Sequence, residues 1–215
     1  MGGIIVRQAD ASCLETYDKI PMIISVERIL KLETPQNGLG GMRLAEEDVP
    51  RPYRKDFGRY EQITRLPQRF CLANWAFFLA CDGGEPVGGA IVAARTPGVH
   101  MLEGRDDLCV LWDIRVAEEY RGQGIGSRLF EQAAQWGRAQ GMRQMKIESQ
   151  NNNVRAAHFY AGKGAVLGAM NTRAYQDEPE VAEEIQLIWY LDTCQLDFCL
   201  PAKFNLTYVD KDGQK

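Results

Sequence analysis

The chain has 215 residues, of which 45% are hydrophobic, 25% charged and 9% aromatic, and its net charge is −4. This composition is typical of one folded globular domain, and it excludes a disordered chain, a collagen-like repeat and a disulfide-stapled miniprotein. A mildly acidic chain has no surplus of basic residues for a polyanion, so we expect no nucleic-acid partner. No apolar run approaches the ~20 residues of a membrane helix, so we expect no membrane partner.

Cysteine and histidine are the residue types that would mark a zinc site or a disulfide framework. The six cysteines form no Cys-x-x-Cys pair, and with only two histidines beside them no zinc spacing can be drawn. The first ten residues lack the basic and long apolar regions of a secretory signal. We therefore expect reduced thiols, no metal ion and a cytoplasmic location.

The first seventy residues give the weakest pattern. Residues 12–32 have a mostly helical composition, which Pro21 interrupts. Residues 34–52 are punctuated by glycine and proline, and this predicts a long loop. We expect residues 1–70 to form an extension or lid that packs on the same domain.

After residue 70, strands and helices alternate. Two apolar runs, at residues 69–81 and 87–94, flank the glycine-rich turn at 82–86 and predict a β-hairpin. Residues 108–116 predict a third strand. Residues 125–140 carry apolar side chains at helical spacing and predict a helix that stops at Gly141.

The later elements complete an α/β pattern. We expect a strand at 142–149, a short helix from Asn153 to Tyr160 and a strand at 185–191. Strands that alternate with helices in this way predict one mixed α/β sheet. The expected organisation is therefore a core at residues 71–192, followed by a tail or an extra strand at 193–215.

The densest signal for chemistry lies between the expected strand and the amphipathic helix. Three glycines at alternate positions leave several backbone N–H groups free to converge on one small volume. The helix that starts there adds its unpaired N–H groups and the positive end of its dipole. Together these predict a cradle for a phosphate or pyrophosphate. Its residues are Arg121, Gly122, Gln123, Gly124, Ile125, Gly126 and Ser127.

The glycine spacing fits neither a dinucleotide fingerprint nor a P-loop, which needs a lysine at its end. The pattern Arg-x-x-Gly-x-Gly instead resembles the acyl-coenzyme A pyrophosphate motif of the GNAT superfamily of N-acetyltransferases. Two more segments resemble that family in order and spacing. They are the strand Leu111–Val116 and the run Asn153–Tyr160, which reads Asn-x-x-Ala-x-x-Phe-Tyr.

This resemblance implies a GNAT fold, in which the fourth and fifth strands of a mixed central sheet splay apart and acetyl-CoA lies in the opening. Acetyl-CoA is then the acyl-donor substrate, and no metal is needed. The pantetheine arm is expected to pair with the backbone of the fourth strand as an added strand would. Besides the cradle, the resemblance implies acetyl-CoA contacts from Ile114, Arg115, Val116, Asn153, Ala156, Phe159 and Tyr160.

The family pattern also implies catalytic residues. Tyr160 stands where the family places the general acid for the leaving thiolate, although a packing role for a helix tyrosine is the alternative. Asp113 and Glu148 are both candidates for the general base. For each carboxylate, an ion-paired or solvated side chain is the alternative, and a water relay could also move the proton.

The charge pattern bears on the acceptor. Residues 110–165 carry eight basic and five acidic side chains, which suits a phosphorylated donor. Residues 166–192 carry one basic and six acidic side chains, which suits a cationic amine or else forms a solvated loop. Four further segments resemble the streptothricin acetyltransferase branch of the family. They are Glu33–Pro35, Tyr53–Phe57, Thr172–Tyr175 and Glu184–Tyr190.

The expected activity is therefore transfer of acetyl from acetyl-CoA to a primary amine of a small cationic acceptor, with a streptothricin-like antibiotic as the lead. One alternative is acetylation of a protein lysine or N-terminus, which needs an open groove above the thioester. Another is an acyl-CoA-binding sensor without turnover, which would keep the cradle and lack a working acid and base. Dimers are common in the resembled family, so a homodimer is also expected.

Overall fold

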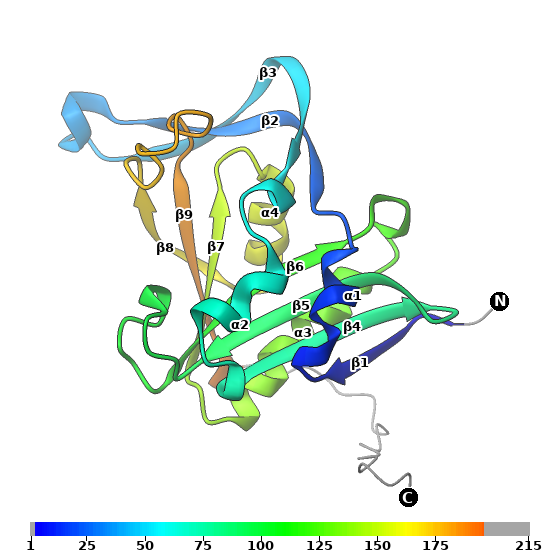
Figure 1. Ribbon diagram of the computed structural model, residues 1–215. Coiled ribbons are helices and arrows are strands. Elements are labelled where there is room, and N and C mark those ends of the chain that lie inside the picture. The colour runs from blue at the N-terminus through cyan, green and yellow to red at the C-terminus, as the bar shows by residue number, and fades with distance from the viewer. Residues whose placement is uncertain (1–2, 196–215) are drawn as a thin grey trace, which may run out of the picture.

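The computed structural model describes residues 3–195. The C-terminal tail expected at 193–215 thus lies largely outside the described residues. Helices and strands alternate through the second half of the chain (Figure 1). The helices are α1 (Leu14–Asp18), α2 (Leu66–Arg69), α3 (Ile125–Ala139) and α4 (Val154–Gly162). The strands are β1 (Ile5–Ala9), β2 (Ile23–Glu33), β3 (Arg43–Asp56), β4 (Trp75–Asp82), β5 (Glu85–Ala94), β6 (Leu108–Val116), β7 (Gln144–Gln150), β8 (Val166–Asn171) and β9 (Gln186–Asp192).

Within the described residues, seven of the strands form one mixed sheet in the order β1-β4-β5-β6-β7-β9-β8. Its neighbours pair antiparallel, except for the parallel pair β6 and β7. That parallel pairing runs only from Leu108 opposite Gln144 to Leu111 opposite Ile147. Beyond Leu111 the two strands separate, so the sheet opens at one end between β6 and β7.

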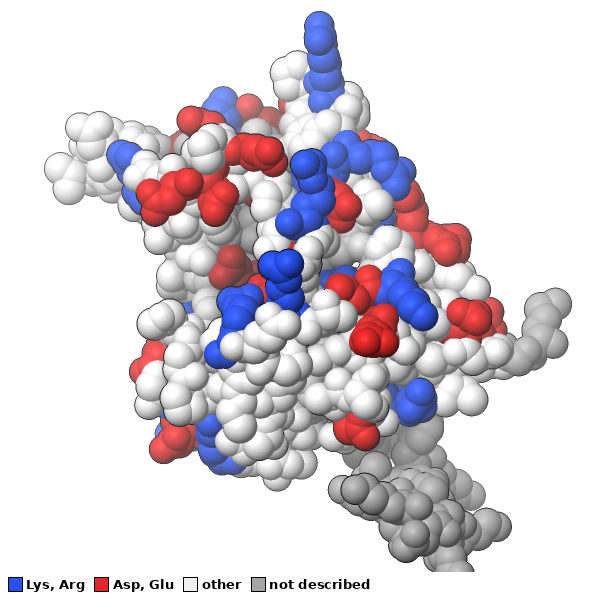
Figure 2. All heavy atoms as spheres, in the orientation of Figure 1, with Lys and Arg blue, Asp and Glu red and all other residues white. Residues whose placement is uncertain are grey.

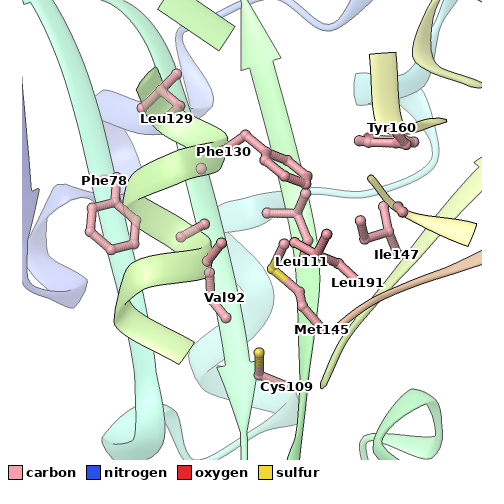
Figure 3. Packing of buried hydrophobic residues seen from close by; sticks show 14 of the residues in the cluster. Phe78, Val92, Cys109, Leu111, Leu129, Phe130, Met145, Ile147, Tyr160 and Leu191 are labelled. Carbon is pink, nitrogen blue, oxygen red and sulfur yellow. The ribbon is translucent and has the colours of Figure 1, made fainter. Parts of the chain in front are cut away.

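The two faces of the sheet are buried by different helices. On one face α3 and α4 cover a core that includes Phe78, Leu111, Leu129 and Met145 (Figure 3). On the other face α1 and α2 cover a second core with Tyr17 and Leu79. Apolar residues of β4 and β5 contribute to both cores, which accounts for their nearly continuous apolar sequences.

The elements expected after residue 70 are confirmed, and β6 has the predicted bounds. The hairpin turns at Gly83 and Gly84, both with positive φ, as its glycine-rich sequence predicts. Asn153 caps α4 by accepting a hydrogen bond from the Ala156 N–H at 3.2 Å. None of the helices in residues 3–195 has the length and apolar character needed to cross a membrane.

The prediction for residues 12–52 is wrong in two places. The helix ends at Asp18 and is followed by strand β2, while most of the expected long loop is strand β3. These two strands form a separate antiparallel ribbon, in which Ile24 lies opposite Lys55. Pairing between segments some twenty residues apart decides this structure, and local composition does not report it.

Two further strands had no prediction. Strand β1 pairs with β4 and extends the central sheet. Part of the segment that was expected to form an extension or lid is therefore a strand of the central sheet. Strand β8 pairs with β9 at the opposite edge. Both are short edge strands, whose apolar pattern is weak because one side of each is exposed.

Candidate active site

A cavity of about 780 Å³ opens where β6 and β7 separate. It is lined by the end of β6, the start of α3, the end of β7 and one face of α4, and it is covered by Met22, Ile24 and Phe57 from the N-terminal part of the chain. Most of the predicted site residues line it. They are Ile114, Arg115, Val116, Arg121, Gly122, Gly124, Ile125, Gly126, Ser127, Glu148, Asn153, Ala156, Phe159 and Tyr160.

The glycine cradle has the geometry that an anion site needs. Gly122 and Gly124 have φ values of 79° and 78°, a left-handed conformation that favours glycine. Gly124 is the N-cap of the 15-residue helix α3 and supplies no capping side chain, so the first N–H groups of the helix are left for a ligand. A Cβ built on either glycine would enter open space. These features fit a diphosphate.

A single methyl group tests the cradle. Gly124→Ala is expected to raise the Kd of acetyl-CoA by about tenfold or more, because its methyl group enters the volume that a diphosphate would fill. Gly141→Ala is the matched control. Gly141 lies beyond the other end of α3 with a φ of 77° and the same open surroundings, so its backbone strain is equal. Calorimetric titration would contradict the cradle if both variants bound acetyl-CoA equally.

Arg121 has a structural role besides the expected charge at the rim. Its guanidinium donates to the Val116 carbonyl at 3.0 Å and to the Ile23 carbonyl at 2.6 Å. Partial burial lowers the pKa of this guanidinium. Arg121 therefore ties strand β2 to the end of β6 beside the cradle. Gln123, which was expected in the cradle, does not line the cavity, and its amide donates to the Glu119 carbonyl at 3.3 Å.

The exposed backbone edge of β6 borders the cavity. Among the described residues, the β6 positions after Leu111 have no partner on β7, and Ile114 and Val116 line the opening. An unpaired strand edge of this kind can receive an extended ligand as an added strand. Its N–H groups can also polarise a carbonyl oxygen placed there.

Tyr160, on α4, lines the cavity and is buried, with 5% of its surface exposed. Its ring packs against Phe130, Phe159 and Trp189. Burial, with a smaller contribution from the charge of Asp113, raises the pKa of the Tyr160 hydroxyl well above its usual value. The hydroxyl thus stays protonated at neutral pH and can donate a proton into the cavity.

Asp113 does not lie at the cavity, so its candidacy as the general base is not supported. Its carboxylate is buried on the opposite face of β6, where it accepts from Arg115 at 2.9 and 2.5 Å and from the Tyr17 hydroxyl at 2.6 Å. Neighbouring strand residues point to opposite faces, and Ile114 faces the cavity. Asp113 is therefore the ion-paired carboxylate that was the alternative to a general base. The Arg115 side chain is 2% exposed, so only the backbone of Arg115 can reach the opening.

This assignment makes Asp113 a stability residue. Asp113→Asn is expected to lower the free energy of unfolding by about 3 kcal/mol, because it leaves the Arg115 charge buried without its partner. The turnover of the folded fraction is expected to stay near that of the wild type. Denaturant titration and activity per folded molecule check this, with the half-exposed Asp107→Asn as a matched control. A fall in turnover without a fall in stability would restore Asp113 as a catalytic candidate.

Glu148 is the carboxylate that the structure brings to the cavity. One oxygen accepts from the Tyr175 hydroxyl at 2.7 Å, and the other accepts from the Gln186 amide at 2.8 Å. Burial and the Glu148 charge raise the pKa of Tyr175, so this hydroxyl remains a donor. Tyr175 and Gln186 were not predicted as site residues, although both lie in segments that resemble the streptothricin acetyltransferase branch. The β7–β9 pairing places Gln186 opposite Gln150, close to Glu148, whereas Tyr175 comes from the loop between β8 and β9.

The acidic stretch after β8 lies beside this end of the cavity. Figure 2 shows carboxylates gathered at the upper left, over the β2–β3 ribbon and the loop between β8 and β9. Two of the carboxylates contact the N-terminal part of the chain. Glu184 pairs with Lys55, and Glu180 accepts from the Tyr60 hydroxyl at 3.5 Å. Among residues 3–195, no group of three or more His, Cys, Asp and Glu side chains is placed to hold a metal ion.

Comparisons with known proteins agree with this geometry. The sequence model described as "Acetyltransferase (GNAT) family" matches residues 42–165. Streptothricin acetyltransferase A of Bacillus subtilis (strain 168) is 37% identical over 145 residues, which cover 67% of this chain and 76% of that protein. A streptothricin acetyltransferase of Escherichia coli is 33% identical over 85 residues, which cover 40% of this chain and 49% of that protein.

Solved structures share the fold. Nourseothricin acetyltransferase superposes with a TM-score of 0.70 at 21% identity, over 88% of this chain and 98% of that one. A Bacillus anthracis str. Ames protein, provisionally assigned as a streptothricin acetyltransferase and solved in complex with acetyl coenzyme A, superposes with a TM-score of 0.69 at 24% identity. That superposition covers 88% of this chain and 99% of the other.

Proposed function

The chain belongs to the GNAT family of acetyltransferases, and from this premise we propose that it transfers acetyl from acetyl-CoA to an amine of a small cationic antibiotic of the streptothricin class. The observation that carries the proposal is the cavity itself. Its lining brings together a glycine cradle at a helix N-terminus, the carboxylate of Glu148 and side chains from the N-terminal part of the chain. Streptothricin acetyltransferase A of Bacillus subtilis, which is 37% identical to this chain over 145 residues, supports this acceptor.

The donor end is formed by the cradle and the edge of β6. The N–H groups at the start of α3 would hold the diphosphate of acetyl-CoA, and Arg155, which lines the same cavity, adds a positive charge. The unpaired edge at Ile114 and Val116 would hold the pantetheine arm. The amide oxygen of Asn153 caps α4, which leaves its amide nitrogen as the group that can donate to the donor substrate.

The acceptor end is formed by Glu148 and its hydrogen-bond partners. The carboxylate attracts a substrate ammonium and takes one of its protons, which produces the neutral amine needed for attack on the thioester carbon. The backbone N–H groups of β6 stabilise the negative charge that develops on the carbonyl oxygen. Tyr160 then gives its proton to the sulfur as the carbon–sulfur bond breaks. The second proton lost by the nitrogen restores the Tyr160 hydroxyl through water, and Glu148 releases its proton to solvent. The products are the acetamide and free coenzyme A.

The cover over the cavity favours a small acceptor over a protein chain. Met22, Ile24 and Phe57 line the cavity, and we infer that they narrow the approach that a lysine on a protein surface would need. We infer that residues 1–70 act as the expected lid at the acceptor end. A cytoplasmic location and a homodimer remain part of the proposal, the first because acetyl-CoA is an intracellular metabolite.

A panel of amines tests the acceptor. Release of free coenzyme A would be followed with streptothricin, an aminoglycoside, a polyamine, free lysine and a short lysine peptide at equal concentrations. We expect kcat/KM to be highest with streptothricin. A higher value with the peptide would contradict the small-molecule acceptor, and no turnover with any amine despite tight acetyl-CoA binding would favour a sensor.

A further inference from the structure

A buried ion pair joins two segments that lie 129 residues apart at the acceptor end of the cavity. Lys55, on β3, contacts both carboxylate oxygens of Glu184, which lies just before β9. Their side chains are 7% and 15% exposed. Lysine is rarely buried to this degree, and a buried charge is tolerated only when a partner compensates for its lost hydration.

Lys55 belongs to the segment that covers the cavity. It lies opposite Ile24 in the β2–β3 ribbon, and its Nζ is 4.5 Å from the centre of the Phe57 ring. Ile24 and Phe57 both line the cavity. A displacement of Lys55 would therefore move two of the side chains that form this cover.

Glu184 belongs to the segment that arranges Glu148. Its charge contributes to the raised pKa of Tyr175, after larger contributions from burial and from Glu148. The next residue, Ile185, donates its N–H to the Asn151 side chain at 2.9 Å, and the one after it, Gln186, donates to Glu148. A shift of Glu184 would thus reach the hydrogen-bond partners of Glu148 through the chain.

We propose that Lys55 and Glu184 are positioning residues, which hold the cover against the acidic loop and so determine how the acceptor amine approaches Glu148. This inference rests on the proposed function. Removal of either charge leaves the other buried without a partner, so the two segments separate. Loss of the Lys55 charge leaves the site more negative, and water would partly screen this charge. We expect the displacement of the cover to weaken acceptor binding more than the extra negative charge strengthens it. Neither Lys55 nor Glu184 lines the cavity or contacts the cradle glycines, so we expect the acetyl-CoA site to keep its affinity.

Three variants test the pair with streptothricin and acetyl-CoA as the substrates. Lys55→Met and Glu184→Gln are each expected to raise the KM for streptothricin by about tenfold or more, because a small misplacement of a bound substrate has large effects. The Kd of acetyl-CoA, measured by calorimetry, is expected to stay near the wild-type value. The charge-swapped double variant K55E/E184K should regain most of the loss, since it restores the pair with its charges exchanged.

Hydrogen exchange provides a second readout that does not depend on turnover. In the acetyl-CoA-bound protein, each single variant is expected to exchange faster at residues 51–60 and 172–185, and the double variant near the wild-type rate. If Lys55→Met does not fold, Glu184→Gln carries the same test, because it keeps the shape of the side chain. If the wild type acetylates no amine, the proposed function fails, while exchange still decides whether the pair holds the cover.

Two results would overturn the inference. One is an unchanged KM for streptothricin in a folded single variant. The other is a parallel loss of acetyl-CoA affinity, which would assign the pair to general stability.

Discussion

Tyr160→Phe is expected to lower kcat by about 100-fold or more, because it removes the hydroxyl that protonates the leaving thiolate. The Kd of acetyl-CoA should stay near the wild-type value, since the ring that packs against Phe130 and Phe159 is retained. The pKa of Tyr160 is raised by burial, so the hydroxyl keeps its proton as the pH rises. The wild type is therefore expected to show no loss of kcat from this group up to about pH 10, the ordinary pKa of tyrosine.

Tyr120→Phe is the matched control for this prediction. Tyr120 also lines the cavity, but its hydroxyl donates to Asp82 at 3.2 Å, and Asp82 is not part of the lining. Its loss should leave kcat close to that of the wild type. Steady-state rates of coenzyme A release would measure both variants. Equal rates for Tyr160→Phe and the wild type would show that Tyr160 has only a packing role, which was the alternative interpretation of the sequence.

Glu148→Gln is expected to lower kcat/KM for the acceptor by about 100-fold at neutral pH. The amide keeps the shape of the side chain but can no longer take a proton from the substrate ammonium. The deficit should shrink as the pH approaches ~10, the range in which an alkylammonium loses its proton without help. Acetyl-CoA binding should be unaffected, because Glu148 lies at the acceptor end.

A pH profile of kcat/KM would decide the role of Glu148. Glu131→Gln is the matched control, since Glu131 lies on α3 and pairs with Lys163 at 2.9 Å outside the cavity. A loss in Glu148→Gln that stayed constant across pH would indicate a binding role. Retained activity would assign the proton transfer to water, the relay that the sequence left open.

The chemistry of the donor end was readable in the sequence because it is local. The cradle, its helix and the Asn153 cap each lie within one short segment, and glycine or a capping side chain is demanded by the backbone at those positions. The choice between Asp113 and Glu148 was not readable in the same way. It depends on which face of β6 is buried by α1 and on the pairing of β7 with β9.

The N-terminal part was the least predictable for the same physical reason. Residues of β2 and β3 acquire their conformation from each other and from contacts such as the one between Leu30 and Asn151, whose carbonyl accepts from the Leu30 N–H at 2.8 Å. The Lys55–Glu184 pair likewise joins residues that no local pattern relates. Sequence patterns predict elements well, but long-range pairing determines the cover and the acceptor end.

The most direct test of the account is a mass spectrum of streptothricin after incubation with acetyl-CoA and the wild-type protein. We predict a product that carries one added acetyl group, formed in step with free coenzyme A, and far less of it with Tyr160→Phe. Unmodified streptothricin, in the presence of protein that binds acetyl-CoA, would contradict the proposed acceptor.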